Sequence, residues 1–442
     1  MMKIENRLKF TLNALQFWKI FSFLAVFALL FSPTLEAQES KKKKESRKVR
    51  LELKNRPSIR FGDALRVDVR AKVQTDFRSF SPQVQTPEGT FDLHRGRVGL
   101  EGQFLKHFEY EIERDFRQSL ANNDQRYPWK DVKLDFTYFD NFQLLVGKFK
   151  MPFGLDETTS EHETDFSLRS RTADDLSPGR SVGGMLHGRF FSRGVSYWAG
   201  FFRHDGENGR NHNGQPIAGQ TFAGRVTGTP IRELAVPEFL RPLELGMGYT
   251  RSDVPEGLSS IRGNAYSDEN LIAYAYVKGP RERMGVDATL ITGPFSLKSE
   301  LVDLREAREG QGIYLEDLPK KLSRGWYASV TWVVTGEKKE GGVTPRKDFL
   351  KGGPGAIELA ARFEQIRFGT AKHIGDEFRS PRSPNFRAQS DRSWTIGVNW
   401  YTNRYVKIQA DAVNEQIEDL TRSPIPGTKG FWLGILRLQF VM

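Results

Sequence analysis

A strict alternation of apolar and polar residues begins at Leu65 and limits the possible folds more than any other feature of the sequence. From Leu65 to Gln74 every odd position is apolar and every even position is polar. This period of two is the pattern of a β-strand with one apolar face and one hydrated face. The pattern continues to Phe77. The strand is therefore longer than those typical of soluble sheets, and it suits a tilted strand that crosses a membrane.

Comparable runs recur along the rest of the chain. Seventeen such segments follow residue 64, whereas a barrel built from one bacterial chain contains an even number of strands. We therefore expect about 16 to 18 strands, with about 16 as the preferred number, and the stretch 56–62 is a candidate for a missed strand. A barrel of that size encloses an aqueous channel. The segments are 65–77, 93–104, 108–113, 132–138, 142–149, 182–190, 193–203, 221–228, 242–251, 270–278, 284–292, 295–303, 324–336, 356–366, 393–401, 404–413 and 429–441.

The connections between these segments differ in length. The turns at 106–107 and 141 are tight, whereas others are long and rich in Gly, Pro, Asp, Asn, Arg and Ser. Short turns at one end and long loops at the other are typical of transmembrane barrels, and closure of the sheet satisfies the backbone polar groups in lipid. The sequence therefore predicts an all-β fold, a transmembrane antiparallel β-barrel. The long connections are 117–130, 150–181, 204–220, 304–323, 337–355, 367–392 and 414–428.

A secreted β-sandwich is the alternative fold, because its strands would also alternate. Three features disfavour it. The strands are long, paired aromatic residues such as Trp400-Tyr401 lie near strand ends, and the apolar face of the last segment ends in Phe440, two residues before the terminal Met442. A closing strand with an aromatic residue near its end resembles the assembly signal of outer-membrane proteins.

The N-terminal residues have the organisation of a secretory signal peptide. A basic segment precedes an apolar stretch at 17–31, and Ala37 provides a small residue for cleavage. The apolar core is short for the alternative, a membrane anchor helix. Export would take the protein to the outer membrane of a double-membrane bacterium. The expected organisation is a signal peptide at 1–37, a basic periplasmic tail or linker at 38–55 and the barrel at 56–442.

The net charge of +11 is concentrated near the N-terminus. Residues 56–442 hold 54 Lys and Arg against 50 Asp and Glu, which leaves +4. Much of the rest lies in the KKKKESRK stretch at 41–48. We expect this stretch to be a solvated linker, and contact with an anionic polymer or lipid headgroup is the alternative. It has no interleaved aromatic residues, so the sequence predicts no nucleic-acid partner.

Enzymatic chemistry finds little support in the sequence. The chain has no Cys, which excludes thiolate metal sites and Cys nucleophiles, and its seven His are scattered without metal-ligand spacing. It also lacks a P-loop, a dinucleotide fingerprint and a serine elbow. Ser160, His162 and Asp165 lie close in sequence, but a catalytic triad is defined by geometry. We therefore predict no catalytic residue, no metal and no cofactor.

Five short stretches follow one another in the order found in a known family. They are RGRVGLEG at 95–102, GKFKMPFGLD at 147–156, FAGRV at 222–226, GWY at 325–327 and GVNWYTN at 397–403. Taken together, they resemble the phosphate-selective porin O/P family of outer-membrane β-barrel porins. Each stretch alone is weak, and their series is more specific.

The resemblance implies a barrel of 16 strands, assembled as a homotrimer in outer-membrane lipid, that passes small anions or other small solutes. It also implies that the loop after the Pro-Phe-Gly motif, at about 150–181, folds into the lumen as the constriction. Relatives vary in substrate, so phosphate selectivity stays open. The alternatives are a barrel that acts as an adhesin or enzyme through its long extracellular loops, and a closed barrel without conductance.

Candidate pore residues follow from the alternation and from the expected constriction loop. The hydrated positions of the first two strands carry basic residues, and those of the third carry Glu109, Glu111, Glu113 and Asp115. The two stripes could pair across the wall, or single residues could contact the permeant. The loop 150–181 is acidic overall, so an anion path requires its arginines to cluster away from the acids; arginine would then suit phosphate through bidentate hydrogen bonds. The pore-lining and anion candidates are Arg66, Arg70, Lys72, Arg95, Arg97, Arg169, Arg171 and Arg180.

Overall fold

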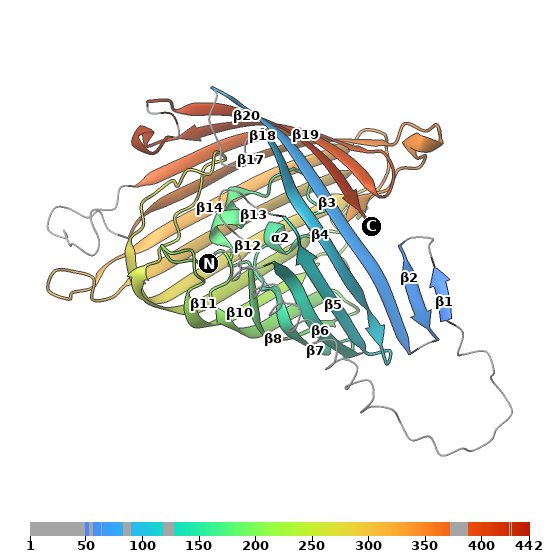
Figure 1. Cartoon of the computed structure of the whole chain (residues 1–442), viewed down its shortest axis with the longest axis horizontal. Coiled ribbons are helices and arrows are strands. Elements are labelled where there is room, and N and C mark those ends of the chain that lie inside the picture. The colour runs from blue at the N-terminus through green and yellow to red at the C-terminus, as the bar shows by residue number, and fades with distance from the viewer. Residues whose placement is uncertain are drawn as a thin grey trace, which may run out of the picture. The chain divides into compact units, whose positions relative to one another are not determined.

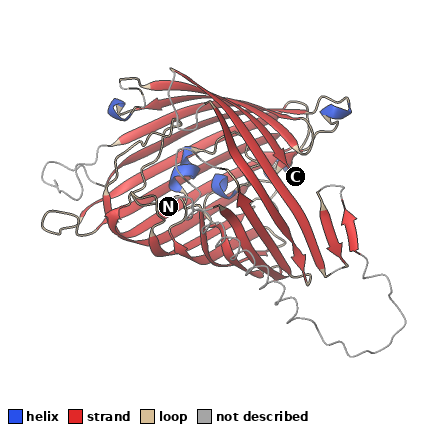
Figure 2. Cartoon of the chain, viewed as in Figure 1, coloured by secondary structure: helices blue, strands red, loops and turns tan. Residues whose placement is uncertain are grey.

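Sixteen strands form one closed antiparallel β-barrel in the computed structural model (Figures 1 and 2). The structure describes residues 49–52, 56–62, 64–82, 90–117, 128–371, 388–423, 425 and 427–442. The predicted signal peptide and the basic stretch at 41–48 lie outside the described residues. Within them, no helix is long and apolar enough to cross a membrane.

Each barrel strand pairs with its sequence neighbours, and the last strand pairs with the first. Arg437 of the last strand lies opposite Asp76 of the first, and this pairing closes the ring. The predicted number of 16 is thereby confirmed. The barrel strands are β3(Leu65–Ser81), β4(Phe91–Phe104), β5(Phe108–Asp115), β6(Trp129–Phe139), β7(Phe142–Lys150), β8(Arg180–Phe190), β9(Val195–His204), β10(Ala218–Gly228), β11(Glu244–Leu258), β12(Tyr276–Thr292), β13(Phe295–Arg308), β14(Leu318–Val333), β17(Ala356–Thr370), β18(Gln389–Tyr401), β19(Val406–Ile417) and β20(Gly430–Val441).

A short hairpin lies outside the ring. It consists of β1 (Val49–Glu52), within the predicted tail, and β2 (Ser58–Phe61). β2 pairs with Leu65–Asp68 of β3, where β20 no longer reaches, because β20 pairs only with residues 72–81 of that strand. The stretch 56–62 therefore contains a strand, but this strand is not one of the sixteen.

The sequence count of seventeen segments was one too high because it divided a single strand. The segments 270–278 and 284–292 both overlap β12, while residues 270–275 belong to the preceding loop. Gly279-Pro280 and the charged Arg281 and Arg283 interrupt the apolar pattern. The strand nevertheless continues through them, with a register irregularity between Lys278 and Arg281.

The two ends of the barrel carry connections of different length, as predicted. One end has tight turns at 105–107, 140–141, 191–194, 293–294 and 402–405. One predicted long connection lies at this same end: residues 334–355 join β14 to β17 and contain β15 (Lys339–Glu340), β16 (Gly342–Val343) and η4 (Phe349–Lys351). A second longer connection at this end carries η3 (Glu238–Leu240), and η6 (Leu420–Arg422) lies in the last loop at the opposite end.

The wall is uneven in length around the ring. The strands from β5 to β10 have 8 to 11 residues, whereas those from β11 to β14 have 14 to 17. Along β14 the outward residues are apolar or aromatic from Trp326 to Trp332, and the inward ones are polar or packed against loops. Alternation of this kind is what a barrel in lipid requires.

Candidate functional site: the lumen

The loop between β7 and β8, residues 151–179, lies inside the barrel. It contains the short helix α2 (Leu155–Thr158) and the π-helical turn η2 (Thr172–Leu176), which Figure 1 shows within the ring of strands. Phe153 and Leu176 of this loop are fully buried. The inward-folded loop predicted from the Pro-Phe-Gly motif is therefore present at the predicted position.

Carboxylates on the inner wall hold this loop by accepting hydrogen bonds from its backbone. Glu300 of β13 accepts from the N–H groups of Leu155 and Asp156, both at 3.1 Å. Glu364 of β17 accepts from Arg171 at 2.7 Å, and Asp411 of β19 accepts from Ser167 at 2.6 Å. Backbone N–H groups removed from water need such partners, and ionised acceptors form the stronger hydrogen bonds.

A second loop also folds inward, and the alternation pattern of the sequence does not predict it. Residues 259–275 join β11 to β12, and Glu306 accepts a hydrogen bond from Ile261 N at 3.1 Å. Tyr266 N donates to Glu415 of β19, four strands further around the ring, at 2.9 Å. The apolar residues Ile261, Leu271 and Ile272 in an otherwise polar loop were the available signal, because loop residues that face only water are seldom apolar.

The two loops pack together and fill one side of the lumen with an apolar core. Phe153 and Leu176 of the first loop contact Ile261, Leu271 and Ile272 of the second in one buried cluster. The wall contributes Val302, Leu304, Ile366, Phe368, Ile417 and Phe431 to the same cluster. This half of the lumen therefore resembles the interior of a soluble protein rather than an aqueous channel.

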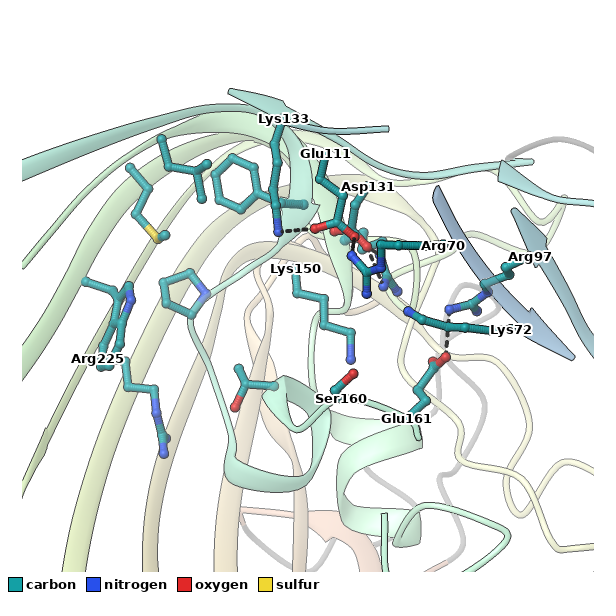
Figure 3. A pocket seen from close by; sticks show the side chains of 17 residues that line it. Arg70, Lys72, Arg97, Glu111, Asp131, Lys133, Lys150, Ser160, Glu161 and Arg225 are labelled. Carbon is teal, nitrogen blue, oxygen red and sulfur yellow. Dashed lines mark hydrogen bonds and ion pairs between the residues drawn. The ribbon is translucent and has the colours of Figure 1, made fainter. Parts of the chain in front are cut away.

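The other side of the lumen contains an open cavity of about 340 Å³, which we call the wall-side cavity (Figure 3). It lies between the inner face of the strands from β3 to β10 and the loop residues Pro152 to Glu161. Its lining holds seven basic and three acidic side chains, an excess of four positive charges. The basic residues are Arg70, Lys72, Arg97, Lys133, Lys150, Arg180 and Arg225, and the acidic ones are Glu111, Asp131 and Glu161.

Ion pairs along the wall orient these side chains. Lys72 Nζ lies 2.9 Å from Glu113, and Lys133 Nζ lies 2.9 Å from Glu111, which also pairs with Arg70. The basic and acidic stripes of β3 to β6 therefore do pair across the wall. More cationic than anionic side chains face the cavity, because Glu113 and Asp287, the partners of Lys72 and Arg225, do not line it.

Glu161 is the point where the inward loop meets the basic wall. Its carboxylate lies 2.7 Å from Arg95 Nε and 2.6 Å from Arg97 Nη1 (Figure 3 shows the latter pair). Burial alone would raise the pKa of Glu161, but Arg95 and Arg97 hold that pKa well below its ordinary value. Glu161 is therefore a fixed negative charge at the edge of the cavity.

The acidic character of the loop is largely balanced by nearby cations. Asp165 pairs with Lys298 at 2.8 Å and with Lys339 of β15 at 2.5 Å. Burial would raise the pKa of Asp165, but these two lysines keep it far below its ordinary value. Asp165 is therefore neutralised locally and does not line the wall-side cavity.

The eight candidate residues from the sequence occupy different places. Arg70, Lys72, Arg97 and Arg180 line the wall-side cavity. Arg95 contacts Glu161 from beside the cavity, whereas Arg66 lies near the tight turns, 3.1 Å from Asp68.

The three arginines of the loop region do not gather away from acids. Arg169 donates to Thr159 O at 2.7 Å and lies 3.5 Å from Asp156. Arg171 stacks on Tyr266 at 4.8 Å and lies 3.6 Å from Asp175, and Arg180 donates to Asp131 at 2.9 Å. Arg169 and Arg171 thus stabilise the loop itself, and only Arg180 lines the wall-side cavity.

Three lining cations were missing from the sequence candidates. Lys133, Lys150 and Arg225 complete the basic lining. Lys133 lies in a strictly alternating segment, so its parity could have identified it. Arg225 donates two hydrogen bonds to Asp287, at 2.6 and 2.9 Å, a pairing between β10 and β12 that the alternation does not reveal.

The possible triad around Ser160 does not form with Asp165. Ser160 Oγ lies 2.8 Å from His162 Nδ1, but the Asp165 carboxylate forms ion pairs with Lys298 and Lys339. Burial and the nearby Lys72 lower the pKa of His162 to about 4. Among the described residues, no group of three or more His, Cys, Asp or Glu side chains could hold a metal ion.

Known proteins match this chain over most of its length. The family described as phosphate-selective porin O and P matches residues 67–425. Porin O of Pseudomonas aeruginosa is 23% identical over 394 residues, which cover 80% of this chain and 83% of that protein. The outer membrane channel DcaP of Acinetobacter baumannii has a TM-score of 0.54 at 9% identity, and OmpT, an outer membrane protein of Vibrio cholerae, has 0.52 at 8%. Both structures align with 86% of this chain and 98% of their own.

The sixteen strands form a closed barrel with tight turns at one end, long loops at the other and charged residues facing a partly open lumen. These features define an outer-membrane barrel with the fold of the channel proteins. The chain belongs to the phosphate-selective porin O and P family. The resemblance drawn from its five short stretches is thereby confirmed.

Proposed function

We propose that the protein is a porin in which small anions diffuse passively through the wall-side cavity. The excess of four positive charges in a cavity of about 340 Å³ carries this proposal. Rings of charge at the narrowest point set the selectivity of a pore. The loop 151–179 would be the constriction, because it packs with the loop 259–275 against the inner wall and fills one side of the lumen.

A bias towards phosphate is the more specific form of this proposal. Arg70, Arg97 and Arg180 line the same cavity. Guanidinium groups bind phosphate oxygens in pairs, which favours phosphate over a spherical anion. The family name points in the same direction.

Assembly and export complete the proposal. The wall from β5 to β10 is the short side of the barrel, and we assign the contact between protomers of a homotrimer to it. A structure of Vibrio cholerae OmpT with a TM-score of 0.52 is described as a trimer form. Residues 1–37 would be removed as a signal peptide during export to the outer membrane.

Conductance of the refolded protein in planar bilayers tests the proposal. In a KCl gradient, stepwise openings with a reversal potential on the anion side support it, and block of the current by added phosphate supports the phosphate bias. A cation-side potential would keep the channel and contradict the anion preference. A folded barrel without conductance would instead favour an adhesin or an enzyme that uses the long loops.

A further inference from the structure

Five arginines form a row on the outer surface of the barrel, near the ends of the strands that carry the long loops. Their side chains point away from the lumen, since they occupy outward positions of β11, β13, β14, β17 and β18. We call these residues the arginine row: Arg251, Arg305, Arg324, Arg367 and Arg392.

The strand register places the members of the row at one level. Glu282 of β12 lies opposite both Arg251 and Arg305. Arg324 lies opposite Asp303 on one side and Arg367 on the other, and Arg392 lies opposite Gln365, two residues from Arg367. The row therefore spans six neighbouring strands, with Glu282 in place of an arginine on β12, and the loops contribute nothing to it.

An aromatic belt lies directly beneath the row. Two positions nearer the tight turns, β11 carries Tyr249, β14 carries Trp326 and β18 carries Trp394. Phe363 of β17 contacts Trp326 and Trp394, with ring centroids 5.3 and 4.5 Å apart. Aromatic residues of membrane barrels gather where the hydrocarbon meets the headgroups, so the row lies at headgroup level. The long loops are extracellular, which makes this the outer leaflet.

The row has more positive charge than its neighbours balance. The exposed fractions of the Arg251, Arg305 and Arg324 side chains are 58, 52 and 62%. One carboxylate, Asp303, serves both Arg305 at 2.8 Å and Arg324 at 2.6 Å. With Glu282 as the other acid, five guanidinium groups and two carboxylates leave a net charge of +3.

Two features of the row favour the binding of an anion from outside the protein. Arg324 and Arg367 are direct cross-strand neighbours, a pairing of like charges that destabilises a sheet, and Asp303, the acid beside Arg324, is shared with Arg305. Arg392 is exposed and, within the described parts of the chain, forms no ion pair.

We propose that the arginine row binds the phosphate groups of a phosphorylated lipid headgroup in the outer leaflet. Guanidinium pairs match phosphate oxygens, and surface cations at this depth attract anionic headgroups. The row faces outward, so a phosphate ion in the lumen does not reach it, and the source is the lipid. The short wall carries one exposed outward arginine at this level, Arg203 of β9. The bound lipid would thus mark the long-strand side of the barrel, β11 to β18, as the side that faces the membrane.

The test uses the full-length folded protein, purified in detergent and titrated with diphosphoryl lipid A while native mass spectrometry counts the bound lipid. The variant Arg324→Gln/Arg367→Gln/Arg392→Gln is compared with Arg232→Gln/Lys347→Gln/Lys351→Gln, which removes three exposed charges at the tight-turn end. We expect the first variant to bind about 100-fold more weakly and the second to bind like the wild type. Both should keep wild-type conductance, because neither set lines the lumen cavity.

Three outcomes would overturn the proposal. One is wild-type affinity in the row variant, and another is equal affinity of the protein for diphosphoryl and fully dephosphorylated lipid A. The third is release of the lipid by millimolar inorganic phosphate, which would identify free phosphate as the ligand. Loss of the trimer in the row variant alone, with lipid affinity unchanged, would assign the row to a contact between copies. The inference depends on the barrel and its outer-membrane location and not on anion selectivity. A cation-selective pore would therefore contradict the proposed function without contradicting this inference.

Discussion

Arg437 and Asp76 form a buried, two-contact ion pair across the seam where β20 meets β3. Arg437 Nε lies 2.6 Å from one carboxylate oxygen and Nη2 lies 2.7 Å from the other, and both side chains are fully buried. Arg437 also donates to the backbone of Ser167 in the inward loop. The Arg437 side chain thus contributes both to the closure of the ring and to the position of the inward loop.

Removal of Asp76 should destabilise the closed barrel. In Asp76→Ala, Arg437 remains in the lumen with one partner fewer, and breaking a buried pair in this way costs about 3 to 5 kcal/mol. The compact form that migrates fast on unboiled gels should be lost at a lower temperature than in the wild type. The double variant Asp76→Leu/Arg437→Leu should recover part of the loss, and an Asp76→Ala barrel as heat-resistant as the wild type would contradict the role of the pair.

Neutralisation of Glu161 should increase anion preference. Glu161 is a largely shielded negative charge between Arg95 and Arg97 at the edge of the wall-side cavity. A unit charge about 4 Å from a permeating ion is worth about 1 kcal/mol even in water, or about fivefold in relative permeability. In Glu161→Gln the reversal potential in a KCl gradient should move further to the anion side. Glu163→Gln, two residues away and more exposed, should move it little.

Lys133 provides the opposite test on the wall. Lys133→Gln removes a lining cation, while Glu111 keeps its pair with Arg70. Anion preference should fall by up to about fivefold by the same estimate. Arg66→Gln is the matched control, because Arg66 was a candidate from the sequence that lies outside the cavity. Equal effects of the two variants would contradict the assignment of the permeation path to the wall-side cavity.

The stability of the protein should fall as pH rises towards 7 because of Asp175 in the inward loop. Burial raises the pKa of Asp175 to about 7, and although Arg171 opposes the rise, Asp174 and Glu364 add to it. Between the ordinary pKa of Asp, about 4, and pH 7, the folded protein holds a proton that the unfolded chain has lost. Stability from this group is therefore complete at low pH and is lost as pH rises through the window.

Thermal unfolding at pH 5 and pH 8 measures this effect. The difference between the two temperatures should shrink in Asp175→Asn, whose side chain does not ionise. Asp140→Asn, an exposed residue in a tight turn, is the control and should keep the wild-type difference. A wild-type pH dependence in Asp175→Asn would refute the role of Asp175.

The wall of the barrel follows from the sequence because local alternation determines it. The run from Leu65 to Gln74 and the face of the last strand are readable one residue at a time, since parity alone separates lumen from lipid. The same rule placed Arg70, Lys72 and Arg97 correctly on the inner face. Parity failed at β12, where Gly279-Pro280 and two arginines hid a continuous strand.

The contents of the lumen could not be predicted in the same way. Which cations remain beside the open cavity depends on long-range pairs, such as Asp165 with Lys339 and Arg225 with Asp287. The second inward loop is held by Glu306 and Glu415, which lie on strands far apart in the sequence. No periodicity marks such contacts, because they join positions separated by tens to hundreds of residues.

The apolar core inside the barrel has a consequence for engineering and for assembly. The inner faces of β13 and β17 carry Val302, Leu304, Ile366 and Phe368 where a channel wall would otherwise be polar. Deletion of either inward loop would therefore expose an apolar inner surface to water. We expect the widened barrel to collapse or the protein to aggregate. The same inner surfaces stay exposed during assembly until the loops cover them, so we expect the loops to enter the lumen no later than the closure of the seam between β20 and β3.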